Sequence, residues 1–255
     1  MPTRDTAWPT GTPCWVDLGA PDLPAATAFY GAVMGWEFVD TGEDFGHYTL
    51  AKVGGRNAAA IGPSQPGQPP AWTVYLATDD ADATAKLVAD NGGTIVVAPM
   101  DIPGNGRLGV ALDAAGGAFG IWQEAGMIGA EVYNEPGSLV WEDARLTDAA
   151  AGQAFYAAVF GHTFGAVPGA PDDYVTFAVD GEIAGGMGGM MGAPEGTPSH
   201  WLPYFMVADV DAALAAAGSG GGTVLMAATD TPFGRMGIVT DPFGATFAVH
   251  GGMPS

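Results

Sequence analysis

The chain repeats itself once over a very long period. CWVDL followed by AFYGAVMGW, within residues 14–36, returns as VWEDA followed by AFYAAVFGH within residues 140–162. The offset is 126 residues at this point. Further on, GGT returns after 129 residues, and DAAG returns as DPFG after 128. A period of this length indicates a duplicated domain rather than a solenoid unit. The sequence therefore predicts two related domains, which can pair face to face and form a cleft between them.

Composition limits the class of protein and its partners. The 255 residues are 48% hydrophobic, which is enough for two domains with cores of their own. Asp and Glu number 28 against 7 Lys and Arg, a net charge of −21, which disfavours nucleic acid and anionic membranes as partners. The single Cys14 cannot form an internal disulfide, and the sequence shows neither a signal peptide nor an apolar run long enough to span a bilayer. We expect a cytoplasmic protein.

Local signals predict a unit of one strand, one helix and three strands. After a strand at residues 15–18, Asp22 is expected to cap a helix with Pro24 in its first turn and Gly35 at its end. Three strands follow, and the same order recurs from residue 72, again from residue 139 and again from residue 201. The prediction is an α+β fold with four such units and curved, mixed sheets. We expect an arm at 1–10, a first domain at 11–126, a linker at 127–137 and a second domain at 138–251.

These motifs resemble those of the vicinal oxygen chelate superfamily, which includes glyoxalases, bleomycin-resistance proteins and extradiol dioxygenases. The helix AFYGAVMGW and the closing DPFGATF of residues 241–247 look like the first helix and last hairpin of that family. The likeness occurs once in each half and together covers nearly the whole chain. The chain is similar in particular to tandem glyoxalase-like proteins of actinobacteria. The resemblance implies tandem glyoxalase-like domains, but a fold by itself does not define a function.

The chain departs from the family at the positions that bind metal. Metal-dependent members place His, Gln or Glu on the first strand of each unit and Glu on the last strand. Counting back from the Phe-Tyr pair of each first helix places the first-strand position on Trp15 and on Trp141, and its counterparts in the second units fall near Trp72 and Trp201. The last-strand positions fall near Gly120 and Ala248. Indole has no lone pair for a metal, and zinc, nickel or iron needs three or more N, O or S ligands. We therefore expect neither a metal site nor a cofactor.

The tryptophans and two aspartates are the candidate site residues. Alternation along a strand puts Trp15 and Asp17 on one face, and Trp141 and Asp143 on the equivalent face. One interpretation is an aromatic-walled cleft in which these carboxylates act as catalytic acids or bases, or as hydrogen-bond acceptors. The alternative is that the tryptophans fill the core between the domains and that the aspartates accept backbone N–H groups near a helix start.

The histidines are scattered and lack the spacing of a metal cluster. We expect His200, which precedes Trp201, to bind ligand at the mouth of the pocket, together with His47. His162 follows a helix-ending glycine and is expected to be a solvated turn residue.

Three functions remain after these exclusions. The first is a metal-independent protein of the bleomycin-resistance type, which binds a hydrophobic or aromatic small molecule in a tryptophan-lined cleft. The second is an enzyme of the same superfamily, such as a metal-free acid–base lyase or isomerase, or a glyoxalase- or dioxygenase-like enzyme in natural-product or aldehyde metabolism. The third is a non-catalytic interaction protein. The expected partner is a small molecule, with no nucleic acid or membrane, and the chain could be a monomer or a homodimer, with halves that pair within the chain or swap in a dimer.

Overall fold

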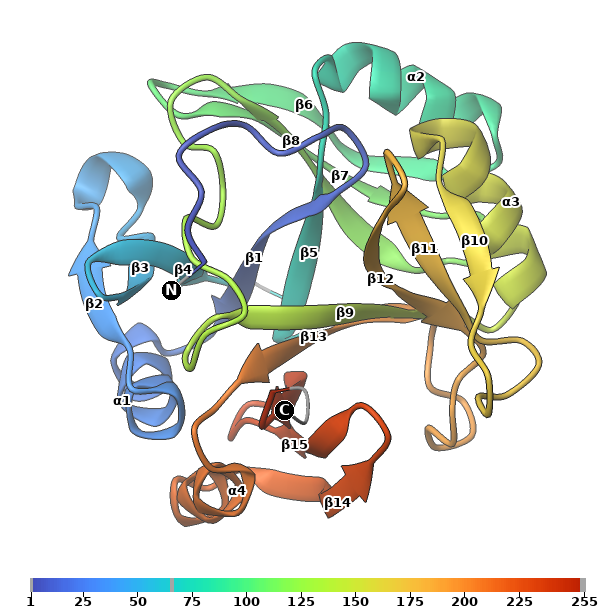
Figure 1. The fold of residues 1–255 in the computed structure, drawn as a ribbon. Helices are drawn as coiled ribbons and strands as arrows, with labels where there is room; N and C mark the ends of the chain where they lie inside the picture. The colour runs from blue at the N-terminus through green and yellow to red at the C-terminus, as the bar shows by residue number, and fades with distance from the viewer. Residues whose placement is uncertain (1, 65–66, 253–255) are drawn as a thin grey trace.

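The computed structural model describes residues 2–64 and 67–252, and it contains the predicted unit four times (Figure 1). The first two units comprise β1 (Pro13–Ala20), α1 (Leu23–Met34), β2 (Glu37–Asp40), η1 (Glu43–Phe45), β3 (Thr49–Val53), β4 (Arg56–Pro63), β5 (Ala71–Ala77), α2 (Ala81–Asp90), β6 (Thr94–Ile102), β7 (Gly106–Leu112) and β8 (Ala118–Glu124). The last two comprise β9 (Leu139–Arg145), α3 (Ala149–Phe160), β10 (Thr163–Ala166), β11 (Val175–Val179), β12 (Glu182–Gly188), β13 (His200–Met206), α4 (Val210–Ser219), β14 (Thr223–Thr231), β15 (Gly234–Thr240) and β16 (Thr246–His250).

Each half of the chain builds its own eight-stranded sheet. The strand orders are β2-β3-β4-β1-β5-β8-β7-β6 and β10-β11-β12-β9-β13-β16-β15-β14, so the second half repeats the topology of the first. In both sheets the first strand pairs in parallel with the fourth and antiparallel with the fifth. The predicted α+β fold with tandem domains and mixed sheets is confirmed, and the sheets form within a half.

The helix boundaries follow the predicted capping signals. The Asp22 carboxylate accepts the backbone N–H of Ala25 at 3.0 Å, and Pro24 lies in the first turn of α1. The helix ends at Gly35, whose φ of 73° lies in the left-handed region where glycine is favoured. The second half repeats this arrangement with Asp148 and Gly161. Local chemistry therefore fixes where both helices start and stop.

The two halves pack through their helices and through one face of each sheet. Helix α1 contacts α4, and α2 contacts α3. The Tyr30 hydroxyl donates to Asp241 of the second half at 3.0 Å, and the same bond is formed in reverse by Tyr156 and Asp113 at 2.9 Å. All four side chains are almost completely buried. These reciprocal bonds hold the halves together within a shared apolar core.

Trp72 and Trp201 lie in this shared core. The Trp72 indole N–H donates to the Tyr30 hydroxyl at 3.1 Å, and Trp201 donates to Tyr156 at 2.8 Å. Their exposed fractions are 7% and 3%. The expectation that these two line a cleft is therefore corrected: they occupy the strand face that packs against the helices, as the core-filling alternative described.

The N-terminal segment runs across the other face of the first sheet, beside the segment that follows β8 (Figure 1). Thr3 bridges to Val132, and the Trp8 indole donates to the carbonyl of Ala130 at 3.1 Å. Residue 1 of the predicted arm lies outside the described residues. Within the described part of the chain, none of the helices is both long and apolar enough to cross a bilayer.

His162 is buried, which corrects its expected place in a solvated turn. Its exposed fraction is 3%, and its ring stacks on Phe177 with centroids 4.5 Å apart. The ring Nε2 lies 2.8 Å from the Gly11 carbonyl oxygen, and burial lowers the pKa of His162 to about 4. The side chain of His162 therefore lies inside an aromatic cluster and not in solvent.

Candidate functional site

The same four side chains recur on both sheets, on the face opposite the helices, which we call the inner face. In the first half they are Trp15, Asp17, Tyr48 and Tyr75. In the second half they are Trp141, Asp143, Tyr174 and Tyr204. In each set the tryptophan and aspartate come from the first strand of the half. One tyrosine immediately precedes the third strand, and the other lies in the fifth strand. The duplication therefore created two related carboxylate sites.

In the first half, Asp17 is held by two phenols. Tyr48 and Tyr75 each donate a hydroxyl to its Oδ2 atom at 3.0 Å, and the Trp15 indole donates to the Tyr48 oxygen at 2.9 Å. Burial raises the pKa of Asp17 to about 6, and the two phenol hydrogen bonds oppose part of that rise. Burial also raises the pKa of both tyrosines well above 10, so they act as neutral donors.

In the second half, Asp143 meets three donors. Trp141 and Tyr174 each donate to Oδ1 at 2.9 Å, and Tyr204 donates to Oδ2 at 2.7 Å. Arg145, two residues further along β9, donates from Nη2 to the Tyr204 hydroxyl at 3.0 Å. The Tyr204 hydroxyl therefore links a guanidinium to a carboxylate. The aspartates accept side-chain donors in both halves, so the expected alternative of backbone N–H bonds near a helix start is corrected.

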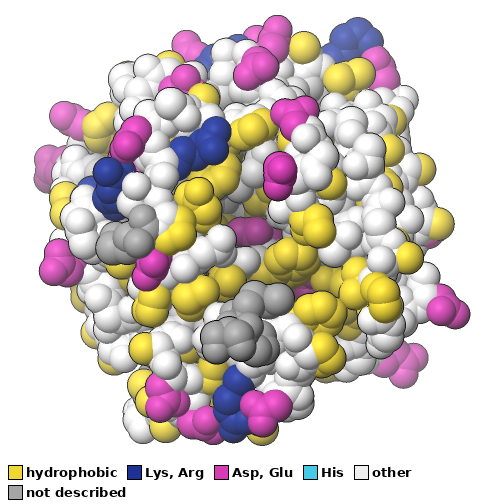
Figure 2. All heavy atoms as spheres, viewed as in Figure 1, with side chains coloured by type: hydrophobic (Ala, Val, Ile, Leu, Met, Phe, Trp, Pro, Cys, Tyr) yellow, Lys and Arg dark blue, Asp and Glu magenta, His cyan; other side chains and the backbone are white. Residues whose placement is uncertain are grey.

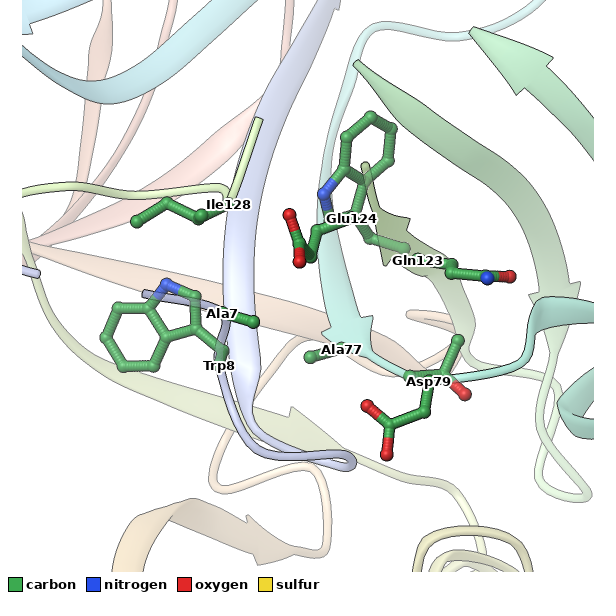
Figure 3. Close-up of a pocket in the computed structure, with 9 residues that line it drawn as sticks. Ala7, Trp8, Ala77, Asp79, Gln123, Glu124 and Ile128 are labelled. Atoms are coloured by element: carbon green, nitrogen blue, oxygen red, sulfur yellow. The ribbon is translucent and has the colours of Figure 1, made fainter. Parts of the chain in front are cut away.

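The inner face of the first half is closed. Trp15 and Tyr75 have exposed fractions of 3% and 5%, and they form a cluster with Trp122 against which Trp8 and Met127 pack. A small cavity of about 150 Å³ remains at its edge (Figure 3). Trp8 and Ile128 stand on one side of it, and the other side carries Asp79, Gln123 and Glu124. The arm and the segment after β8 thus cover the inner face of this half.

The inner face of the second half holds a cavity of about 660 Å³. Its lining is mainly apolar and aromatic, with a few polar groups: Asn134, Val140, Trp141, Asp143, Val167, Tyr174, Thr176, Ile183, Tyr204, Met206, Phe233, Met236 and His250. The face of the molecule in Figure 2 is rich in acidic side chains, and a hollow near its middle has hydrophobic walls with an acidic side chain at its floor. A cavity of this size and lining is typical of a small-molecule site.

The residues at these sites do not fit a divalent metal. Within residues 2–64 and 67–252, no three His, Cys, Asp or Glu side chains come together as a possible metal site. Near the last-strand position of the first half, the ring of Tyr75 occupies the space that a side chain at Gly120 would need. Each carboxylate already accepts neutral phenol donors, which are poor metal ligands while protonated.

One further buried acid lies beside the second site. Glu142 has an exposed fraction of 7%, and burial, followed by the charge of Asp143, raises its pKa to about 8. Successive side chains on a strand point to opposite faces, so Glu142 lies on the face opposite its neighbours Trp141 and Asp143. It is therefore part of the packing behind the site.

The predicted site residues divide into two groups. The structure places Trp15, Asp17, Trp141 and Asp143 on the inner faces. Trp141 and Asp143 line the larger cavity, whereas Trp15 is buried in the closed half, which corrects its expected place in the wall of a cleft. His47 is exposed and lies 2.9 Å from the Asp40 carboxylate. His200 is half-buried and directs Nδ1 to the Pro198 carbonyl at 2.9 Å, and burial lowers its pKa. The structure thus gives these two histidines local partners away from the lining residues of the larger cavity.

Sequence reasoning missed the four tyrosines, Arg145 and His250. The repeat itself carried a signal for the tyrosines, because Tyr48 and Tyr174 share the 126-residue offset and Tyr75 and Tyr204 share the 129-residue offset. Arg145 had no such signal, since its counterpart is Gly19. His250 ends β16, where its Nδ1 accepts the backbone N–H of Gly252 at 2.9 Å.

Comparison with known proteins identifies relatives along the whole chain. The sequence model of the Glyoxalase/Bleomycin resistance protein/Dioxygenase superfamily matches residues 14–122 and 138–249. The protein named "Putative glyoxylase CFP32" from Mycobacterium bovis is 39% identical over 98% of this chain and 97% of its own length. The anthracycline biosynthesis protein DnrV of Streptomyces peucetius is 37% identical over 96% of this chain and 94% of its own.

Solved structures confirm the fold. The Mn(II)-bound glyoxalase from Novosphingobium aromaticivorans superimposes with a TM-score of 0.65 at 16% identity, covering 94% of this chain and 83% of that one. The 2,2',3-trihydroxybiphenyl 1,2-dioxygenase from Sphingomonas wittichii gives a TM-score of 0.65 at 17% identity, covering 96% and 91%.

Proposed function

The chain belongs to the glyoxalase/bleomycin resistance protein/dioxygenase superfamily, and from this premise we propose that it binds a hydrophobic or aromatic small molecule, without a metal, in the cavity of its second half. The observation that carries the proposal is the cavity itself. Its volume of about 660 Å³ suits a ligand of drug-like size, and its apolar walls enclose one carboxylate held by three donors.

The shape and chemistry of the walls favour a flat ligand. Trp141 and Phe233 offer broad aromatic surfaces, and Met206 and Met236 are flexible enough to adapt around a bound ring. One relative is named for anthracycline biosynthesis and another for glyoxylase activity. Both names suit a protein that handles small organic molecules.

Fluorescence titration tests the location of binding. We expect planar aromatic compounds to quench the tryptophan emission of the wild-type protein because Trp141 lines the cavity. Trp141→Phe should remove most of this quenching. Trp15→Phe is the matched control, because Trp15 stands at the equivalent position of the closed half, and it should leave the quenching intact. Equal loss in both variants, or no response to any compound, would overturn the proposal.

Metal independence has a separate test. Protein purified without chelators should contain less than stoichiometric divalent metal by elemental analysis, and treatment with a chelator should not change ligand affinity. A full equivalent of tightly bound metal that is lost together with ligand binding would refute this part of the proposal.

An acid–base enzyme is the second candidate, and the linkage of Arg145, Tyr204 and Asp143 favours it. A hydroxyl between a guanidinium and a carboxylate can pass a proton to or from a bound molecule. Mass spectrometry and chromatography of each bound compound after incubation separate the two candidates. A new product that requires Tyr204, and is lost in Tyr204→Phe, would establish catalysis, whereas unchanged ligand supports binding alone.

A further inference from the structure

On the basis of the proposed function, we infer that Arg145 and Asp143 together select the ligand of the second half: a hydrophobic compound that carries a carbonyl or carboxylate oxygen and a hydroxyl on one body. Arg145 would donate to the oxygen, and Asp143 would accept the hydroxyl. Neither residue acts through a metal in this scheme.

Arg145 is a buried cation with unused hydrogen-bonding capacity. Its exposed fraction is 8%, and the one hydrogen bond that its side chain forms among the described residues is the donation from Nη2 to Tyr204. Its Nε is buried and has no hydrogen-bond partner among residues 2–64 and 67–252. A guanidinium has five N–H donors, and a buried donor without a partner is costly, so such a group needs an explanation. A ligand oxygen beside Tyr204 would give the guanidinium a second hydrogen-bond partner.

The position of Arg145 connects it to the cavity. Trp141, Asp143 and Arg145 occupy alternate positions on β9, so their side chains leave the strand on the same face. Two of these three line the cavity, as does Tyr204, to which Arg145 is hydrogen bonded. The Tyr204 hydroxyl lies 3.0 Å from the guanidinium and 2.7 Å from the carboxylate. The guanidinium of Arg145 and the carboxylate of Asp143 therefore flank the hydroxyl of Tyr204, which lines the cavity.

The other half shows that the fold does not require this cation. In the register of the two sheets, Arg145 pairs with Gly188 and the equivalent Gly19 pairs with Gly62. Asp17 keeps two phenol partners there without any arginine. The buried guanidinium thus occurs in the half that has the large cavity, and its counterpart in the closed half is a glycine.

A purely structural role makes a different prediction. If Arg145 only balanced the charge of Asp143, removing it would weaken the binding of every ligand by the same factor. If it contacts a ligand oxygen, removing it would erase the preference for ligands that carry that oxygen. The comparison of matched ligands separates the two.

The experiment measures affinities by calorimetry for three probes: 4-acetyl-2-naphthol, 2-naphthol and 1-acetylnaphthalene. The first carries both groups, and each of the others lacks one. In the wild-type protein, loss of the acetyl group should weaken binding by roughly ten- to a hundredfold, as expected for a hydrogen bond to a charged group. In Arg145→Met this difference should vanish, while the affinity for 2-naphthol should change by less than about threefold. Asp143→Asn should instead reduce the preference for the hydroxyl.

Controls keep the outcomes distinct. Arg107→Met removes an arginine of the first half that pairs with Asp82 and Asp101, and it should bind all three probes like the wild type. If Arg145→Met does not fold, as judged by circular dichroism, Arg145→Lys keeps the charge but loses the planar fork, and it should reduce the acetyl preference severalfold. Persistence of the preference in these variants, or an equal loss for all probes, would overturn the inference. Absence of binding by the wild-type protein would refute the proposed function itself.

Discussion

Asp17→Asn should make the protein more stable at neutral pH but not at acidic pH. Burial raises the pKa of Asp17 from its ordinary value of 3.8 to about 6 in the folded protein. Between these values the folded state still holds a proton that the unfolded state has lost. The free energy of unfolding of the wild-type protein therefore falls as the pH rises through this window. Asparagine can accept the same two phenol donors through its carbonyl oxygen and never ionises.

The size of the effect follows from the two pKa values. Since one pKa unit corresponds to about 1.4 kcal/mol, ionisation of Asp17 costs the folded state about 3 kcal/mol once the pH exceeds 6. The advantage of the variant over the wild type should thus grow by about 2–3 kcal/mol between pH 4 and pH 8. Comparison of the two proteins at each pH removes the contributions of all other titrating groups.

Urea unfolding at several pH values, followed by circular dichroism, measures this difference. Asp211→Asn is a control that should show no such gain between pH 4 and pH 8, because Arg235 lowers the pKa of that exposed carboxyl and its stabilising charge is lost only at lower pH. If the curves of Asp17→Asn and the wild type run parallel from pH 4 to pH 8, the Asp17 carboxylate is hydrated. The arm would then not close the inner face, and the reasoning would be refuted.

Three further changes test the contact between the halves and the packing of the first half. Tyr156→Phe leaves buried Asp113 without its phenol donor and should lower the free energy of unfolding by about 1–3 kcal/mol in urea titrations; an unchanged midpoint would contradict the bond between the halves. Gly120→Ala forces the Tyr75 ring to move and should cost about 1–3 kcal/mol by the same assay, whereas full stability would show that the ring is loosely placed. Trp8→Ala should speed trypsin cleavage within the arm, and an unchanged rate of cleavage would mean that other contacts hold the arm in place.

The sequence was sufficient for the fold because its signals are local or repeated. The caps at Asp22 and Gly35 act within a few residues, and the 126-residue offset revealed the duplication without any knowledge of contacts. The face of each strand could not be assigned in the same way. Alternation says which residues share a face but not which face meets the helices. The family match puts Trp72 at the position equivalent to Trp15, but in the sheet Trp15 pairs with Tyr75, and Trp72 lies on the face that meets the helices.

The partners of the site residues were beyond reach for a related reason. Tyr48 and Tyr75 are 31 and 58 residues from Asp17 in the chain, and the curvature and pairing of the sheet bring them together. The first strand also has a register shift between Pro13 and Trp15 where it pairs with β5, which no periodicity rule anticipates. Whether the inner face of a sheet is open or filled depends on strand pairing and register between residues far apart in the chain.

The reciprocal tyrosine–aspartate bonds would serve equally well between two separate copies of one half, because each half supplies one of each residue. Separate copies encoded by one gene, however, would carry the same residue at every equivalent position, and both would have an arginine or both a glycine on the inner face. Covalent fusion removes that constraint. Gly19 can stay small on a filled surface while Arg145 is held in the half with the cavity, so joining the halves permits two halves of the same fold to differ, one with its inner face filled and one with a cavity.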